Sequence, residues 1–374
     1  MTSDWITIKA ADFIDFNPRL SLKKGSVATK VAMDKLQPFT KKIPATEKAE
    51  FSGGAKFCNG DTIMARITPC LENGKTAFVD VLEDSEVGFG STEFIVLRAK
   101  EGISDPQFIY YLATSPWFRN VAIKSMVGSS GRQRVQQGVL DELELTVPLL
   151  PEQQKIGAFL AMFDEKIALN NKINDNLQQQ LEALYLGTIN VSASECGSVT
   201  LDEWCHIFTG KKNANHFDED GQYMFFTCGE KPLRINSYIY DGPAIIVSGN
   251  GSYTGRTLFY NGKFDLYQRT YACTLKESLP ADFIFGLFAV LKIELHAKIA
   301  GGTHGSSIPY IVMNDLAKFE FPYSHDEFTA FSGKAKTLLT AIQHNQQENE
   351  VLSQIRDALL PRLMSGELDV TNLT

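Results

Sequence analysis

The stretch NNKINDNLQQQLEAL, residues 170–184, decides the fold. Its apolar residues, with those just upstream, recur at helical spacing, but asparagines occupy places where an apolar seam would be expected. Shifted by 175 positions, the stretch lies on NQQENEVLSQIRDAL, residues 345–359, and asparagine falls on asparagine twice. The chain therefore carries two copies of one helix, about half a sequence apart.

The duplication continues upstream of each helix. The glycine-rich turn and apolar segment GSSGRQRVQQGVLDELELTVP, from Gly128, has a counterpart in GTHGSSIPYIVMNDLAKFEFP, from Gly302. Further upstream, DTIMARITPCLENGKTAFVD from Asp61 matches GPAIIVSGNGSYTGRTLFYN from Gly242: an apolar run leads to Gly, a basic residue and Thr. The predicted plan is globular unit, helix, globular unit, helix.

Each globular unit is predicted to be α+β. Runs such as TAFVDVL, EFIVLRA and AIIVSG are bounded by turn residues and are typical of strands. The segments DPQFIYYLATSPWFRNVAIK, from Asp105, and ADFIFGLFAVLKIELHAKI, from Ala281, are typical of helices. The predicted divisions are two globular domains and two long helices: residues 1–150, then the central helix 151–190, then 191–325, then the C-terminal helix 326–374.

The two long helices have a 4-3 spacing that predicts a coiled coil. The pairing is expected to be antiparallel, because a pseudo-two-fold axis relating the two repeats requires it. One seam is Phe163, Ile167, Asn170, Asn174, Leu177, Leu181 and Leu184; the other is Phe331, Ala335, Leu338, Ile342, Asn345, Asn349, Leu352, Arg356 and Leu359. One antiparallel alignment pairs asparagine with asparagine in both layers: Asn170 with Asn349 and Asn174 with Asn345. Such asparagines restrict register at a cost in stability. The alternative is that each helix packs on its own domain and the asparagines are solvated.

Composition limits the classes of protein. The 374 residues are 44% apolar and 21% charged, enough for two ordinary cores. Lys and Arg total 36 against 44 Asp and Glu, and the net charge of −8 argues against coating DNA by bulk charge. Because the sequence shows no signal segment, no membrane-length apolar run and no CxxC pair among its six cysteines, a cytoplasmic protein with reduced thiols is expected.

Motifs of catalysis do not match. Asn17-Pro18-Arg19-Leu20 lacks the second proline and the aromatic residue of an amino-methyltransferase string, and the six histidines have no zinc-site spacing. The glycines from Gly249 to Gly255 lack the intervals of a dinucleotide loop. The sequence therefore predicts no catalytic residue, no metal site and no cofactor.

The two long helices contain the strings PEQQKIGAFLAMFDEKIALNNKI and LLPRLMSGELDV. With these strings and the plan of globular unit, helix, globular unit, helix, the chain resembles the specificity subunit of Type I restriction-modification enzymes over essentially its whole length. The strings GSTEF, residues 90–94, and SGNGSYTG, residues 248–255, support this resemblance. The second unit has no clear counterpart of GSTEF, and the second helix opens with HDE, residues 325–327, in place of Pro-Glu-Gln-Gln.

This resemblance implies a DNA-recognition subunit that is not itself an enzyme. Each unit would be a target recognition domain that reads one half of a split site on double-stranded DNA. The helix pair would set the spacing and dock two DNA methyltransferase subunits, through which restriction and translocase subunits join. S-adenosylmethionine, ATP and Mg would act only in those partners. The alternative is a coiled-coil scaffold or adaptor without sequence-specific DNA binding, which would need no polar turns.

The residues expected to face DNA lie in the glycine-rich turns and in the loops after the matched apolar runs. Arg and Gln make paired contacts to guanine and adenine edges, and glycine lets the backbone approach phosphate. The predicted DNA-binding residues are Arg66, Thr68, Asn73, Lys75, Ser129, Ser130, Arg132, Gln133 and Arg134 in the first unit, and Asn250, Ser252, Tyr253, Arg256, His304, Ser306 and Ser307 in the second. For any single one, a solvated loop residue or a capping contact is the alternative. Phosphate contacts or simple surface are expected at Lys23, Lys24, Lys41 and Lys42.

Overall fold

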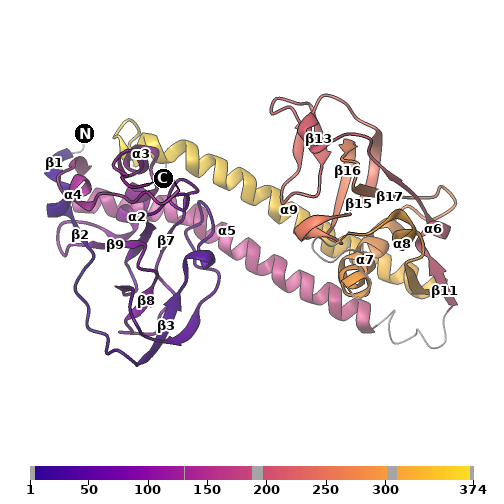
Figure 1. Ribbon diagram of the computed structural model, residues 1–374, viewed down its shortest axis with the longest axis horizontal. Coiled ribbons are helices and arrows are strands. Elements are labelled where there is room, and N and C mark those ends of the chain that lie inside the picture. Colours follow the sequence, from indigo (N-terminus) through magenta and orange to yellow (C-terminus); the bar gives the residue numbers. More distant parts are fainter. Residues whose placement is uncertain (1–4, 130, 188–196, 301–309, 371–374) are drawn as a thin grey trace. The chain divides into compact units, whose positions relative to one another are not determined.

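The computed structural model describes residues 5–129, 131–187, 197–300 and 310–370 (Figure 1). The chain divides into two compact units. The first unit contains Met1–Asn171 and Gln346–Thr374, and the second contains Lys172–Asn345. Each unit mixes helix and sheet.

Two long helices, α5 (Leu150–Tyr185, pink in Figure 1) and α9 (His325–Met364, yellow), contribute to both units. The division between the units cuts each helix near its middle, so each unit contains a segment of both. The sequence predicted a helix from Pro151 to Gly187 and another over about 328–363, and both exist with ends within three residues of those positions.

The first unit holds three small sheets. One has the order β2-β9-β6-β7, one has the order β4-β3-β8-β5, and β1 pairs with β10. Helix α2 packs on β6, β7 and β9. The elements are β1 (Trp5–Lys9), α1 (Ala10–Phe13), β2 (Ile14–Phe16), β3 (Val27–Val31), η1 (Met33–Lys35), β4 (Glu47–Glu50), β5 (Ala55–Phe57), β6 (Thr62–Ala65), β7 (Thr76–Phe78), β8 (Gly88–Gly90), β9 (Phe94–Ala99), α2 (Pro106–Thr114), α3 (Pro116–Lys124), α4 (Gln137–Asp141) and β10 (Glu144–Pro148).

The sequence predicted one helix from Asp105, and this expectation was wrong in one respect: the helix breaks in two at Ser115. Pro116 has no amide hydrogen and restricts the residue before it to extended backbone, and Ser115 has φ −60° and ψ 144°. The Ser115 hydroxyl accepts the Phe118 amide at 3.3 Å and so caps the new helix.

The second unit has one six-stranded sheet of order β12-β17-β15-β16-β13-β14 and a small sheet of β11 and β18. Helix α7 packs on β15, β16 and β17. The elements are β11 (Gly197–Thr200), α6 (Leu201–Trp204), β12 (Cys205–Thr209), η4 (Ala214–His216), β13 (Tyr223–Phe226), β14 (Leu233–Ile235), β15 (Tyr240–Ser248), η5 (Gly251–Tyr253), β16 (Thr257–Leu266), β17 (Thr270–Leu275), α7 (Phe283–Ala300), α8 (Met313–Ala317) and β18 (Glu320–Tyr323).

The main sheets of the two units share a strand order. In the first unit the hairpin β6–β7 is extended by β9 and then β2; in the second, β15–β16 is extended by β17 and then β12. All these pairings are antiparallel. Each unit also pairs its first strand with the strand just before a long helix, β1 with β10 and β11 with β18.

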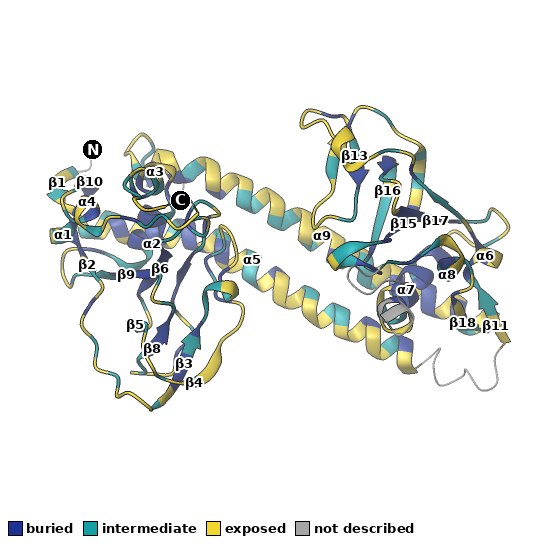
Figure 2. Cartoon of the chain, viewed as in Figure 1, coloured by how far each residue is buried: buried dark blue, intermediate teal, exposed yellow. Residues whose placement is uncertain are grey.

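The buried side chains lie mainly where the helices pack on the sheets (Figure 2). In the first unit, side chains of α2 and β6 are buried together with the α5 residues Ile156 and Leu160. In the second, the first half of α7 is buried nearly all round, together with Leu181 and Tyr185 of α5, while Lys292 and Lys298 are exposed. Each core therefore includes one part of the long helices.

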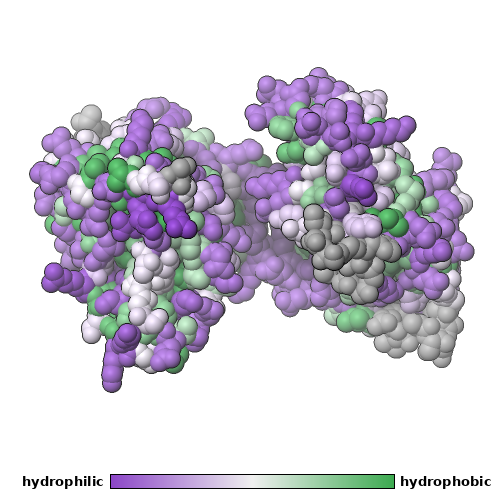
Figure 3. All heavy atoms as spheres, in the orientation of Figure 1, coloured by the Kyte–Doolittle hydropathy of each residue, from purple (hydrophilic) through white to green (hydrophobic). Residues whose placement is uncertain are grey.

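The visible faces of both units are mainly hydrophilic, with smaller hydrophobic patches (Figure 3). No helix in the part of the chain that the structure describes combines the length and apolarity needed to cross a membrane.

Candidate nucleic-acid interface

In the first unit the two segments predicted to face DNA lie against each other. Residues 66–75 connect β6 to β7, and the amide of Thr68 donates to the Gln133 carbonyl at 3.0 Å. The amide of Val135 in turn donates to the Arg66 carbonyl at 2.9 Å. The hairpin loop and the glycine-rich turn therefore form one continuous surface.

Glycine is required in that turn. Gly128 has φ +137°, and a Cβ there would lie 2.9 Å from the Arg132 carbonyl oxygen. Gly131 has φ +77°, in the left-handed region. The resulting turn exposes Ser129 and Arg132. Ser130 lies outside the described residues.

The second unit repeats this arrangement. Residues 249–256 connect β15 to β16, and the amide of Ile311 donates to the Gly249 carbonyl at 2.9 Å. Asn250 and Tyr310 form an isolated antiparallel bridge. The predicted residues His304, Ser306 and Ser307 precede this contact but lie outside the described residues.

Lys75 and Arg256, matched in the sequence, both bind backbone carbonyls. The Lys75 ammonium donates to the Met33 carbonyl at 3.0 Å. The Arg256 guanidinium donates to the carbonyls of Gly229 and Glu230, the latter at 2.7 Å. In each unit this side chain links the hairpin loop to the loop between two preceding strands. The side chain therefore helps to fix the position of the hairpin loop.

The remaining loop residues differ in exposure. Asn73 and Ser252 are exposed, while Thr68, Asn250 and Tyr253 are half-buried. The Thr68 hydroxyl donates to Glu72 at 3.2 Å, and the Tyr253 ring lies 4.6 Å from the Arg256 guanidinium. Asn73 and Ser252 are thus the loop residues best placed to contact an outside partner.

Arginines flank Glu93 on the first unit's surface. Arg134 donates to the Glu93 carboxylate through Nε, at 3.1 Å and 3.0 Å, and through Nη2 at 2.7 Å. Hydrogen bonding by Arg134, opposed by burial and aided by the charges of Arg134 and Arg66, lowers the pKa of Glu93. Glu93 is therefore anionic at neutral pH.

A polar groove of about 340 Å³ adjoins this cluster in the first unit. Its walls include the cationic side chains Lys56 and Arg66, with Asn17 and Thr92. Arg66 Nε is buried without a hydrogen-bond partner in the described part of the chain. Donors and positive charge at this position suit a nucleic-acid backbone.

No three His, Cys, Asp or Glu side chains within the described residues gather as metal ligands would. The model of the Type I restriction modification DNA specificity domain matches residues 50–179 and 194–328, more than half of the chain. The chain belongs to this family.

Known relatives extend the match. The Type I restriction enzyme EcoDI specificity subunit of Escherichia coli is 36% identical over 176 residues, 46% of this chain and 38% of that protein. The EcoAI specificity subunit of the same organism is 29% identical, over 44% of this chain and 27% of that protein. The chain thus spans less than two fifths of the length of these curated relatives.

Two more distant relatives align along almost the whole chain. The MjaVIII specificity subunit of Methanocaldococcus jannaschii is 22% identical, over 99% of this chain and 94% of that protein. The crystal structure of a Type-I restriction-modification system S subunit from M. genitalium has a TM-score of 0.59 at 17% identity, covering 96% of each chain. That structure has the same fold, with mixed helix and sheet.

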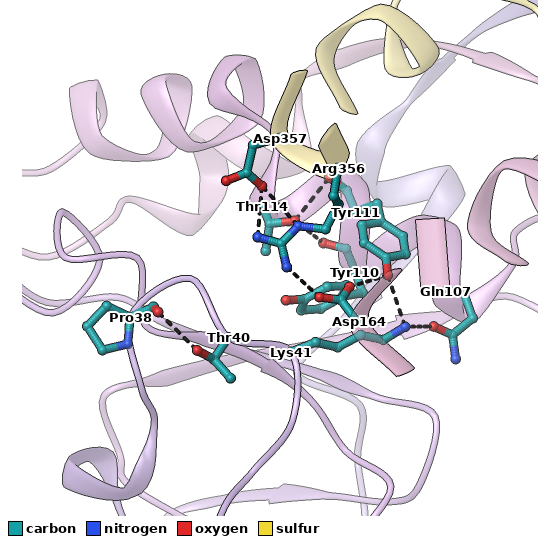
Figure 4. Close-up of polar contacts among 10 residues, drawn as sticks. All are labelled: Pro38, Thr40, Lys41, Gln107, Tyr110, Tyr111, Thr114, Asp164, Arg356 and Asp357. Carbon is teal, nitrogen blue, oxygen red and sulfur yellow. Dashed lines mark hydrogen bonds and ion pairs between the residues drawn. The ribbon is translucent and has the colours of Figure 1, made fainter. Parts of the chain in front are cut away.

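In this member of the specificity-domain family, Lys41 is buried. The expectation that Lys41 is a surface or phosphate contact was wrong: the residue is 4% exposed and its ammonium lies 4.9 Å from the centre of the Tyr111 ring. It donates to Gln107 and to the Tyr111 hydroxyl (Figure 4). Burial, partly offset by the charge of Asp164, lowers the pKa of Lys41 to about 8.

The same network joins both long helices inside the first unit. The Tyr111 hydroxyl donates to Asp164 of α5, and Arg356 of α9 donates to the other oxygen of that carboxylate (Figure 4). Asp357 accepts from the Arg356 Nε at 2.9 Å. The predicted seam residue Arg356 is therefore buried as half of an ion pair.

The four seam asparagines lie in contact in pairs, one pair in each unit. In the first unit, Asn170 Nδ2 donates to Asn349 Oδ1 at 2.8 Å and to Glu348 at 2.7 Å. In the second, Asn345 Nδ2 donates to Asn174 Oδ1 at 2.8 Å. Asn170 is 1% exposed, which does not fit a solvated side chain.

Two residues of the interface region escaped sequence reasoning. Glu93 belongs to the GSTEF string, which was singled out only for the resemblance, and its partner Arg134 is 41 positions away. Asn17 lines the groove and has φ +52°, but in the sequence it was considered only as part of a string that does not match the amino-methyltransferase motif. The GSTEF string was the one signal for Glu93, and nothing in the sequence pairs Glu93 with Arg134.

Proposed function

We propose that this chain is the DNA sequence-recognition subunit of a Type I restriction-modification complex and has no catalysis of its own. The observation that carries the proposal is the family match across both units, together with the repeated surface at the hairpin loop of each. Each unit reads one half of a bipartite site on double-stranded DNA. Specificity then depends on a few base-edge contacts, which a net charge of −8 permits.

The two units arose, on this proposal, by internal duplication. The shared strand orders β2-β9-β6-β7 and β12-β17-β15-β16 support it. The recognition domains are residues 1–150 and 191–325, and the spacers are the segments 151–190 and 326–374, which are built on α5 (Leu150–Tyr185) and α9 (His325–Met364). The helices form an antiparallel coiled coil with a pseudo-two-fold axis. Its hydrogen bonds support that symmetry, because a shift of 175 residues maps the donor Asn170 onto the donor Asn345.

The partners follow from the same proposal. Two DNA methyltransferase subunits dock on the spacer helices, and restriction and translocase subunits join through them. S-adenosylmethionine, ATP and Mg act in those subunits. A scaffold or adaptor without DNA binding is disfavoured, because such a protein would have no use for a polar hairpin loop held by matching backbone contacts in each unit.

A binding assay tests the proposal. The full chain, with and without a Type I methyltransferase subunit, is mixed with a random double-stranded DNA library, and bound DNA is separated by gel shift and sequenced. A split motif enriched by the complex is expected, and the same motif should be methylated in a host that carries both genes. Enrichment of no sequence by the complex, with stable subunit association, would favour the adaptor.

The proposed register of the helices predicts two efficient cross-links. In a background without native cysteines, the pairs N170C/N349C and N174C/N345C should form disulfides under mild oxidation, because these side chains already touch. The pairs F163C/N349C and N174C/L338C, displaced by one heptad, are the matched controls. Non-reducing gels after proteolysis between the helices measure the yield, and faster cross-linking of the controls would reject the register.

A further inference from the structure

The GSTEF turn fixes the position of Glu93. The Ser91 hydroxyl accepts the Glu93 amide at 3.1 Å, and the amide of Phe94 donates to the Ser91 carbonyl at 3.2 Å. The Glu93 carbonyl accepts the amide of Arg66 at 2.9 Å. A turn at the start of β9 therefore holds this carboxylate beside the hairpin loop of the first unit.

Arg134 is held at both its backbone and its guanidinium. Its amide donates to the Val127 carbonyl at 2.9 Å, and the Val127 amide donates back at 3.1 Å. Glu93 engages Nε and one side of Nη2. The side chain is nevertheless 44% exposed. The arginine is thus both immobilised and accessible.

The contacts of Glu93 leave one edge of Arg134 available. Nη1 makes only a long contact, 3.4 Å, to the Arg132 carbonyl. Each terminal nitrogen carries two hydrogens, so one donor on Nη1 and one on Nη2 remain as a parallel fork. Such a fork matches O6 and N7 of guanine in the major groove.

Among the described residues, no other side chain holds that of Arg132, two residues earlier. Its side chain is exposed, and its guanidinium makes no hydrogen bond or ion pair within the described residues. An unconstrained arginine on an exposed turn suits a phosphate, which can be approached from many directions. The two arginines of one turn therefore differ in how far they are pre-oriented.

We propose that Glu93 is a positioning residue that pre-orients Arg134 to read a guanine, while Arg132 contacts the phosphate backbone. This inference rests on the proposed function. The ordering of Arg134 before binding lowers the entropy lost on contact and disfavours other rotamers that would accept other bases. Glu93 also repels phosphate, so Arg134 is directed to the base edge.

Removing the Glu93 carboxylate tests the positioning role. If Glu93 acted only through its charge, its removal would strengthen DNA binding, whereas the loss of positioning should weaken binding to the cognate site. E93Q, in the full chain bound to its methyltransferase, deletes a negative charge near DNA and should leave non-specific affinity unchanged or raised. Affinity for the cognate site should fall about 10-fold or more. The loss of discrimination should be confined to one base pair in one half-site, since the second unit lacks a GSTEF string.

Four companion variants complete the experiment. R134K keeps the charge but not the fork and should relax the same base pair, and E93Q/R134K should be no worse than R134K alone. E93D should restore part of the discrimination. R132Q should weaken cognate and random DNA equally and reduce the slope of log K against log salt by about 0.9. Circular dichroism checks that each variant folds, and exposed ion pairs of this kind contribute little to folding.

Different results test the positioning role of Glu93 and the proposed function of the chain. If E93Q leaves base preference unchanged, or weakens cognate and random DNA equally, the positioning role is overturned while the proposed function stands. If the unmodified complex does not discriminate between sequences, the proposed function itself fails.

Discussion

Replacing Arg356 by leucine should lower the free energy of unfolding of the first unit by about 3–5 kcal/mol. The Arg356 and Asp164 side chains are only 10% and 5% exposed, so the substitution leaves a buried carboxylate without its cation. Tyr111 and Lys41 are neighbours of that carboxylate but cannot replace a guanidinium bonded to it. Urea unfolding followed by circular dichroism measures the change, with the transitions of the two units fitted separately.

A surface arginine on the same helix gives the matched control. Arg362 pairs with Glu367, and both side chains are more than half exposed, so R362A should cost less than about 1 kcal/mol. The double variant D164L/R356L should be more stable than R356L alone, because no unpaired charge remains. Equal effects of R356L and R362A would show that the buried pair does not stabilise the fold.

The proposed duplication suggests that the double variant is tolerable. A shift of 175 residues places Asp164 on Leu339 and Arg356 on Leu181. Leu181 is fully buried in the second core and Leu339 packs against that core. The second unit thus uses leucines where the first uses an ion pair, so the helix backbones accept either solution.

The long helices and the paired loop segments of each unit could be predicted from the sequence because their signals are local or repeated. Helical periodicity needs only neighbouring residues, and the shift of 175 supplied an internal second copy. The glycine-rich turns carry their own backbone requirements, as Gly128 and Gly131 illustrate. Matching positions in two copies then indicated which loops belong together.

The burial of Lys41 could not be predicted in this way. Its neighbours, Lys42 and two prolines within six residues, are typical of a surface loop. The cage around it comes from distant residues: the Phe78 and Tyr110 rings lie 5.4 Å from the ammonium, and the Gln107 side chain accepts a hydrogen bond from it. Tertiary packing decides such a site, and no local pattern reports it.

The roles of the basic loop residues were likewise beyond the sequence. Lys75 and Arg256 were expected to face DNA, but the carbonyl groups that they bind carry no residue-type signature. Arg132 and Arg134 look alike in the sequence, and only the position of Glu93 distinguishes them. The break at Ser115 is different, because Pro116 was a local signal for it. The apolar periodicity on both sides of Pro116 nevertheless indicated a single helix.

Replacing Trp204 by alanine should lower the free energy of unfolding of the second unit by about 3–5 kcal/mol. Trp204 is 5% exposed, stacks on Phe283 of α7 at 5.3 Å, and meets Phe321 of β18 and Phe328 of α9 edge-on at 5.1 Å and 4.9 Å. Truncation leaves a cavity where three elements meet and removes the aromatic pairs, whose energy adds to that of the lost buried area.

W117A, at a tryptophan that is 49% exposed, is the control and should change stability by less than about 0.5 kcal/mol. Urea unfolding of both variants measures the difference, and a W204A effect as small as that of W117A would mean that this aromatic cluster does not anchor the start of α9 in the second core.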